Sequence, residues 1–194
     1  LQVGLLAVAL GGVIGGILGV ISGYFGGAVD LIIGRVIDTI MAFPNILLAL
    51  AIVAALGPSL TNSIVAIGIA TSPRFARVAR AAVMSVGARE YVNAAMALGA
   101  RDEGIVFRHV LPNIVSPLIV ITSLAIGNAI LTEASLSFLG LGVAPPTATW
   151  GAMITDGKQF MDIAPWISVV SGLAIMVAVL GFNLLGDGLR DVLD

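Results

Sequence analysis

The sequence predicts an all-α, polytopic helical membrane protein with five membrane-spanning helices in this chain. The 194 residues are 59% hydrophobic and only 10% charged, with a mean hydropathy of +1.12. A soluble domain of this length usually carries about 25% charged residues, which it needs to hydrate its surface. Gly contributes 24 residues, and such enrichment is typical of helices that pack closely in lipid. These observations indicate a polytopic membrane protein.

Uncharged stretches, separated by charges or turn-forming residues, define the spans. About 20 apolar helical residues cross the ~30 Å hydrocarbon core. Tyr24-Phe25-Gly26-Gly27 ends the first span with aromatic residues and a turn, and Gly57-Pro58-Ser59 separates the second from the third. The segment Gly140–Asp162 is rich in Gly, Pro, Thr and Asp, and we expect a loop there. In order, the predicted spans are about Leu1–Ser22, about Ile37–Leu56, a third that begins near Leu60 and continues past Arg74, Val110–Thr132 and Ile163–Gly186.

The positions of the basic residues predict the orientation in the membrane. If the spans alternate, only Lys158 lies on one side, and the other eight basic residues lie on the opposite side. The positive-inside rule then makes the C-terminus cytoplasmic and places Leu1 outside. Because an odd number of spans with an external start needs a further span upstream, we expect the N-terminal span to be missing here. Residues 1–194 are predicted to form a single transmembrane domain, since no internal repeat or low-complexity linker is visible.

Common catalytic patterns are not found in the sequence. It contains no Cys, and Lys158 lacks the glycine spacing and the hydroxyl residue of a phosphate-binding loop. The sole histidine, His109, has no second His or Cys with which to share a metal ion. A polar residue at the membrane interface is a better interpretation of His109 than half of a serine–histidine pair. We therefore predict no catalytic, cofactor-binding or metal-binding residues.

Several residues within or beside the spans are candidates for packing or transport. Pro44 frees a backbone carbonyl and bends the second span, and Asn45 offers a polar group at that bend, as a translocation path would need. Asp30, Asp38 and Glu133 fall where helices can end, which favours positions at the membrane interface. For the small-residue pattern of the first span, ordinary helix packing is favoured over a pore-lining or dimer role. Its glycines are Gly11, Gly12, Gly15, Gly16, Gly19 and Gly23.

The stretch from Arg74 to Pro112 is the most informative part of the chain. Arg74, Arg77 and Arg80 share one side of a helix that leaves the membrane, where pairing with anionic lipid headgroups is expected. Residues 89–98 favour a helix, Gly99 is well placed to end it, and residues 101–103 begin a second short segment. A short helix displayed on the cytoplasmic face suits docking into a groove of a partner.

This stretch resembles the cytoplasmic EAA motif of binding-protein-dependent ABC importer permeases, Glu-Ala-Ala-x3-Gly-x9-Ile-x-Leu-Pro. The chain has Asn93-Ala94-Ala95, three residues, Gly99, nine residues and then His109-Val110-Leu111-Pro112. Every spacing matches, and the longer pattern from Arg89 to Asn113 resembles the dipeptide/oligopeptide/nickel branch. Asn93 stands where Glu is usual, so Glu90 or Glu103 would have to supply that charge. Further matching segments are 24–27, 42–44, 56–59, 136–142, Pro145-Pro146-Thr147 with Trp150-Gly151, and 182–191.

The resemblance implies a six-span permease subunit of the inner (plasma) membrane. Its partners would be a second permease subunit, two ATP-binding subunits that hydrolyse ATP, an extracytoplasmic solute-binding protein and the lipid bilayer, with no nucleic acid. The second permease is usually a different chain in this branch, but the residues do not distinguish a homodimeric from a heterodimeric pair. Residues from about Arg89 to Glu103 would form a coupling helix, with Gly99 needed for its turn and Pro112 for a hinge into the fourth span. The solute would be a di- or oligopeptide or a nickel chelate, and this chain would hold no cofactor. The coupling-loop residues so implied are Glu90, Asn93, Ala94, Ala95, Gly99, Arg101, Asp102, His109 and Pro112.

Two other classes of protein fit the sequence less well than an importer permease. A secondary transporter or channel would place ionisable groups in the middle of spans and show internal repeats, and neither is clear here. An intramembrane enzyme is disfavoured because His109 is the only histidine.

Overall fold

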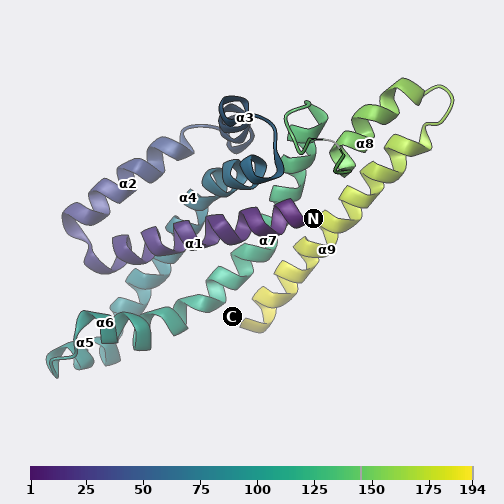
Figure 1. The fold of residues 1–194 in the computed structure, drawn as a ribbon. Helices are drawn as coiled ribbons and strands as arrows, with labels where there is room; N and C mark the ends of the chain where they lie inside the picture. The colour runs from purple at the N-terminus through teal and green to yellow at the C-terminus, as the bar shows by residue number, and fades with distance from the viewer. Residues whose placement is uncertain (145, 194) are drawn as a thin grey trace.

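Long helices form the body of the molecule in a computed structural model that describes residues 1–144 and 146–193 (Figure 1). They are α1 (Gln2–Phe25), α4 (Leu60–Gly87), α7 (Leu111–Phe138) and α9 (Trp166–Leu193). The shorter elements are α2 (Gly27–Met41), α3 (Asn45–Leu56), α5 (Glu90–Ala97), α6 (Asp102–Ile105), α8 (Trp150–Gly157), a π-helical turn (Val106–Val110) and a 3-10 turn (Lys158–Phe160). Within the described residues no strand is present, so the all-α prediction is confirmed. Pro145, in one of the matching segments, and Asp194 lie outside the described residues.

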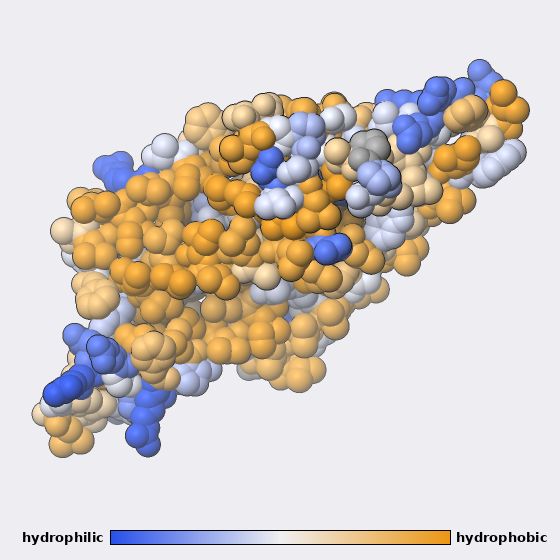
Figure 2. All heavy atoms as spheres, in the orientation of Figure 1, coloured by the Kyte–Doolittle hydropathy of each residue, from blue (hydrophilic) through white to orange (hydrophobic). Residues whose placement is uncertain are grey.

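The helices have the length and surface of a membrane protein. In the part of the chain that the structure describes, three segments could each cross a bilayer: α1, the continuous 37 residues of Asp102–Phe138, and α9. The bent pair α2 and α3 makes up to four. Figure 2 shows a face covered by hydrophobic residues in its middle, with hydrophilic residues gathered at both ends. The polytopic membrane class is confirmed. The count of five stays a prediction, because it requires α4, which has 28 residues but carries three arginines, to cross as well.

The glycines of α1 pack this helix directly on α4. A Cβ atom on Gly15 would collide with the Ser72 carbonyl oxygen, and one on Gly19 with the Ala76 carbonyl oxygen. The two backbones therefore touch, as small-x-x-x-small patterns allow, and α1 and α4 make the most extensive helix contact in the fold. The packing interpretation is confirmed for Gly11, Gly12, Gly15, Gly19 and Gly23, which face α4, whereas a Cβ atom on Gly16 would meet nothing within 4 Å.

The second predicted span is broken into two helices. α2 ends at Met41 and α3 begins at Asn45, and their axes differ by 87°. Pro44 has φ −57° and ψ 132° and directly precedes α3. A proline disfavours helical geometry in the residue before it and donates no backbone hydrogen bond. The bend predicted from Pro44 is confirmed, and it divides the predicted span Ile37–Leu56 between two helices that could still form one broken span.

The segment Gly140–Asp162, predicted to be a loop, contains α8 and a 3-10 turn. The Thr149 hydroxyl accepts a hydrogen bond of 3.2 Å from the Ala152 amide, which caps the start of α8. Gly151 packs against the backbone of Ala134 on α7, and the Lys158 ammonium lies 3.6 Å from the centre of the Phe138 ring. The composition of residues 140–162, rich in Gly and Thr, predicted a loop because these residues are poor helix formers. A capping hydroxyl and contact with α7 stabilise the helix nonetheless.

Two of the three arginines of α4 bind carboxylates on α2 rather than standing free for lipid headgroups. Arg80 makes a bidentate ion pair with Asp30, and both nitrogen–oxygen distances are 2.5 Å. The Arg77 Nη2 atom lies 2.7 Å from Oδ1 of Asp38. The lipid-headgroup prediction is therefore wrong for these two residues. Glu133, expected at an interface, is instead buried in α7, where it accepts a 2.6 Å hydrogen bond from the Ser137 hydroxyl.

Candidate functional site

The segment predicted to couple to a partner forms a short helical hairpin at one end of the molecule (Figure 1). Val92 is the one buried residue of α5. Its side chain belongs to an apolar cluster with Val83 and Val86 of α4 and with Ile105, Val110 and Ile114 from the start of the next helical segment. Because α5 contacts the rest of the molecule mainly through Val92, its other sides face away from the molecule.

Gly99 ends α5 by adopting a left-handed backbone conformation, with φ +80°. The Gly99 amide donates to the Met96 carbonyl at 3.0 Å, and the Ala100 amide donates to the Ala95 carbonyl at 3.1 Å. This pair of hydrogen bonds is the Schellman motif, which favours glycine at the left-handed position. The prediction that Gly99 ends the helix is confirmed.

Pro112 lies inside a continuous helical segment. It is the second residue of α7, and the π-helical turn before it lets the Leu111 amide bond to the Val106 carbonyl. A wider turn accommodates a proline that would otherwise clash with the preceding helical turn. The chain passes from α6 into α7 without a break, and the hinge implied by the resemblance stays a prediction.

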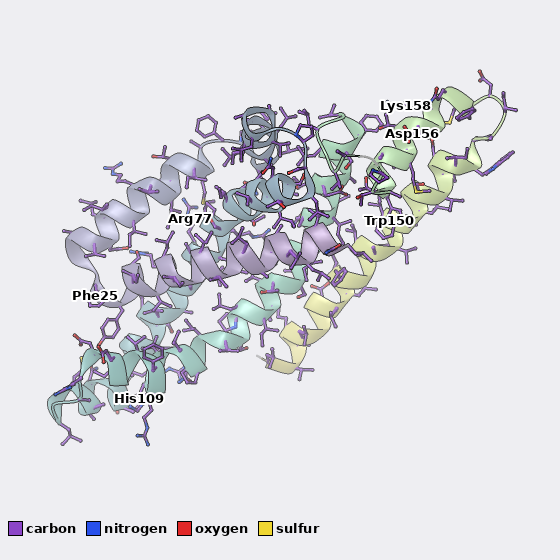
Figure 3. All side chains as sticks on the ribbon, viewed as in Figure 1. Phe25, Arg77, His109, Trp150, Asp156 and Lys158 are labelled. Carbon is purple, nitrogen blue, oxygen red and sulfur yellow. The ribbon has the colours of Figure 1, made fainter. Side chains whose placement is uncertain are left out.

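The predicted coupling-loop residues gather at this end and are largely accessible. Asp102 accepts a 2.8 Å hydrogen bond from the Tyr24 hydroxyl, which ties α6 to the end of α1. His109 is half-buried, with its ring 5.9 Å from that of Tyr91, and lies at the same end as Phe25 (Figure 3). Among the described residues, the side chains of Glu90, Asn93 and Glu103 have no hydrogen-bonding partner. Exposed residues of the set are Glu90, Asn93, Ala94, Gly99, Arg101, Asp102 and Pro112, and Ala95 is half-buried.

Large apolar side chains are exposed beside these polar groups. Leu98 is 89% exposed and Phe107 is 70% exposed. Sequence reasoning concentrated on the motif positions and missed both side chains. For Leu98 the sequence did contain a signal, because a large apolar residue stands next to the helix-ending Gly99 in a segment that was expected to face water.

A second candidate site surrounds the bend before α3. A cavity of about 280 Å³ lies between α3, α4 and α7. Asn45 lines it, whereas Pro44 sets the bend without lining the cavity. That these two residues belong to a translocation path stays a prediction. The polar lining of the cavity consists of Asn45, Thr71, Arg74, Asn128, Thr132 and Ser135. Among the described residues, no three His, Asp or Glu side chains converge as metal ligands.

Known proteins resemble this chain over its whole length. The dipeptide transport system permease protein DppC of Alkalihalophilus pseudofirmus is 49% identical over all 194 residues. The glutathione transport system permease protein GsiD of Pectobacterium atrosepticum is 47% identical over the same residues. The chain spans 64% of the length of each of these curated relatives.

Solved structures share the fold. A subunit of the MetNI methionine ABC transporter in an inward-facing conformation superposes with a TM-score of 0.78, at 18% identity, over 100% of this chain and 92% of that one. A chain of an amino acid ABC transporter superposes with a TM-score of 0.68 at 17% identity, over 98% of this chain and 88% of that one. The model of the family described as binding-protein-dependent transport system inner membrane component matches residues 15–194. The chain therefore belongs to this family of inner membrane transport components.

Proposed function

We propose that this chain is the permease subunit of an ATP-driven importer and that α5 couples it to an ATPase. The observation that carries the proposal is the geometry of α5 together with its motif spacing. The helix is held by the buried Val92, ended by Gly99 and exposed at its other positions apart from the half-buried Ala95. Such a helix can enter the groove of a partner without disturbing the fold that displays it.

The path from α5 to the spans supports coupling. α6, the π-helical turn and α7 form one helical segment of 37 residues, which at 1.5 Å per residue is ~55 Å long. The hydrogen bond between Tyr24 and Asp102 connects the start of this segment to α1. Closure of the ATPase subunits would displace α5 and tilt the attached helices, switching the spans between inward-open and outward-open arrangements.

The proposed assembly contains two ATP-binding subunits, a second permease subunit and an extracytoplasmic solute-binding protein. ATP hydrolysis would take place in the ATP-binding subunits, and residues 1–194 would act as one transmembrane domain. We place α5 and the C-terminus in the cytoplasm. This orientation is supported by the concentration of arginines towards α5 and by the directions of α1, α4 and α9, which run towards the end that carries α5 (Figure 1).

The proposed solute is a di- or oligopeptide, because the relatives named above are dipeptide and glutathione permeases. To test this, the complete importer is reconstituted in proteoliposomes with its binding protein, and uptake of labelled dialanine and labelled glutathione is measured. Uptake of either solute that requires both ATP and the binding protein is expected. Uptake driven by an ion gradient without ATP would instead indicate a secondary transporter.

Replacing Asn93 with Glu is expected to leave assembly intact and uptake within about twofold of the wild type. The Asn93 side chain is exposed and has no partner among the described residues, so an added charge can stay hydrated. Copurification of the ATP-binding subunits and solute uptake provide the measurement. The control is Val92→Asp, which buries a carboxylate in the apolar cluster and should abolish assembly. Loss of assembly in Asn93→Glu would refute the expectation.

A further inference from the structure

Arg74 differs from the other two arginines of its row on α4. Arg77 and Arg80 bind Asp38 and Asp30 of α2. Arg74 lines the cavity between α3, α4 and α7, and within the described residues it has neither an ion pair nor a hydrogen bond. No Asp or Glu lines this cavity. The cavity therefore contains a cation whose charge no neighbouring side chain balances.

The cavity lies well inside the length of its helices. At 1.5 Å per residue, Arg74 is ~21 Å from the start of α4 at Leu60, and Asn128 is ~15 Å from the end of α7 at Phe138. Where α4 crosses the bilayer, as predicted from the sequence, an unpaired guanidinium halfway along this helix is unfavourable unless it serves a solute path or a partner group.

The hydrogen bonds of the lining divide its polar groups into donors and acceptors. The hydroxyls of Thr71, Thr132 and Ser135 each donate to a carbonyl of their own helix at 2.8 Å. Their protons are thus already used, and their oxygens remain able only to accept. Among the described residues, the amide of Asn45 and the guanidinium of Arg74 have no partner and remain free to donate.

We propose that Arg74 and Asn45 bind a carboxylate of the transported solute in this cavity, while the hydroxyl oxygens accept its N–H groups. A guanidinium suits a carboxylate because its planar fork donates two parallel hydrogen bonds. A small peptide carries both required groups, a carboxylate and N–H donors. The inference rests on the proposed import function and adds a solute-binding site to it.

The test uses the absence of Cys from the chain. A single thiol is introduced as Asn128→Cys in the cavity, and its labelling by a maleimide is followed on this subunit within the assembled importer. Dialanine is the probe, and alanyl-alaninamide is the matched probe without a carboxylate. Ser85→Cys serves as the control thiol, because Ser85 is exposed on α4 and does not line the cavity.

Dialanine is expected to slow labelling of the cavity thiol, and its amide is expected not to. Adding Arg74→Gln should raise the half-protecting concentration of dialanine at least about tenfold, as expected for loss of a hydrogen bond to a charged group. In Arg74→Lys the half-protecting concentration should lie between those of Arg74 and Arg74→Gln, because lysine keeps the positive charge but cannot donate two parallel hydrogen bonds. Labelling of the Ser85→Cys thiol should not change.

Several outcomes would overturn the inference. These are equal protection by dialanine and its amide, no protection by dialanine, or an unchanged half-protecting concentration in Arg74→Gln. Loss of the second permease subunit from purified Arg74→Gln importer would show that Arg74 binds a carboxylate of that subunit instead. Labelling needs no ATP, so the two proposals can be tested separately. Protection by dialanine can be observed even where ATP-driven uptake is absent, and it can be absent even where ATP-driven uptake is observed.

Discussion

Replacing Gly15 with Leu is expected to prevent α1 from packing on α4 and to abolish accumulation of the folded protein. A Cβ atom at this position would collide with the Ser72 carbonyl oxygen, and it would lie 2.7 Å from the Phe75 Cβ and 3.0 Å from the Ala76 nitrogen. These atoms belong to, or are attached directly to, the backbone of a packed helix, so no side-chain rotation can relieve the overlap.

The expected loss is a substantial fraction of the stability of the fold. Overpacking a single core position typically costs 1–3 kcal/mol, and occasionally more, where side chains can still adjust. Here two helix backbones would have to separate along an interface that also contains Gly11 and Gly19. We therefore expect a destabilisation of at least about 3 kcal/mol, against a typical stability of about 5–15 kcal/mol.

Gly16 provides a matched control for this prediction. It is the next residue of the same helix, and an added Cβ atom there would meet nothing within 4 Å. Gly16→Leu should retain the folded protein, since Leu is a better helix former than Gly. Size-exclusion chromatography in detergent and thermal unfolding of both variants are the measurements. Similar behaviour of the two variants would show that the close contact between α1 and α4 does not determine stability.

Replacing Gly99 with Leu is expected to lower solute uptake by about tenfold while membrane insertion and ATPase activity persist. A side chain at a left-handed position costs about 1–2 kcal/mol, and about 1.4 kcal/mol changes a population tenfold. Relief of that strain would shift Gly99 from its φ of +80° and break the two hydrogen bonds that end α5. The helix would then meet its partner in the wrong orientation.

Gly87→Leu tests whether any added side chain near α5 has the same effect. Gly87 closes α4, lacks the positive φ of Gly99 and faces open space. This variant should transport normally.

Pro112→Ala should also separate ATP hydrolysis from uptake, because we expect the rigid entry into α7 to transmit the motion of α5. Unchanged uptake in both Gly99→Leu and Pro112→Ala would refute the coupling assignment.

The features that the sequence predicted correctly depend on composition or on neighbours a few residues apart. Scarcity of charge indicated lipid as the solvent, and long uncharged runs indicated helices. The end of α5 at Gly99 and the bend at Pro44 were predictable because glycine and proline act on their own turn of the backbone. The motif spacing of residues 93–112 likewise indicated the family.

The features that only the tertiary structure decided depend on residues far apart in the chain. Arg80 and Asp30 are 50 residues apart, and nothing local distinguishes Arg80 from Arg74. Because α2 covers one part of α4 and leaves another open, two arginines pair with carboxylates of α2 and the third faces a cavity. The sequence by itself determined the membrane class, most of the long helices and the exposed segment that we propose couples to the ATPase. Packing between distant helices decided which polar groups are satisfied within the chain and which remain free to bind something else.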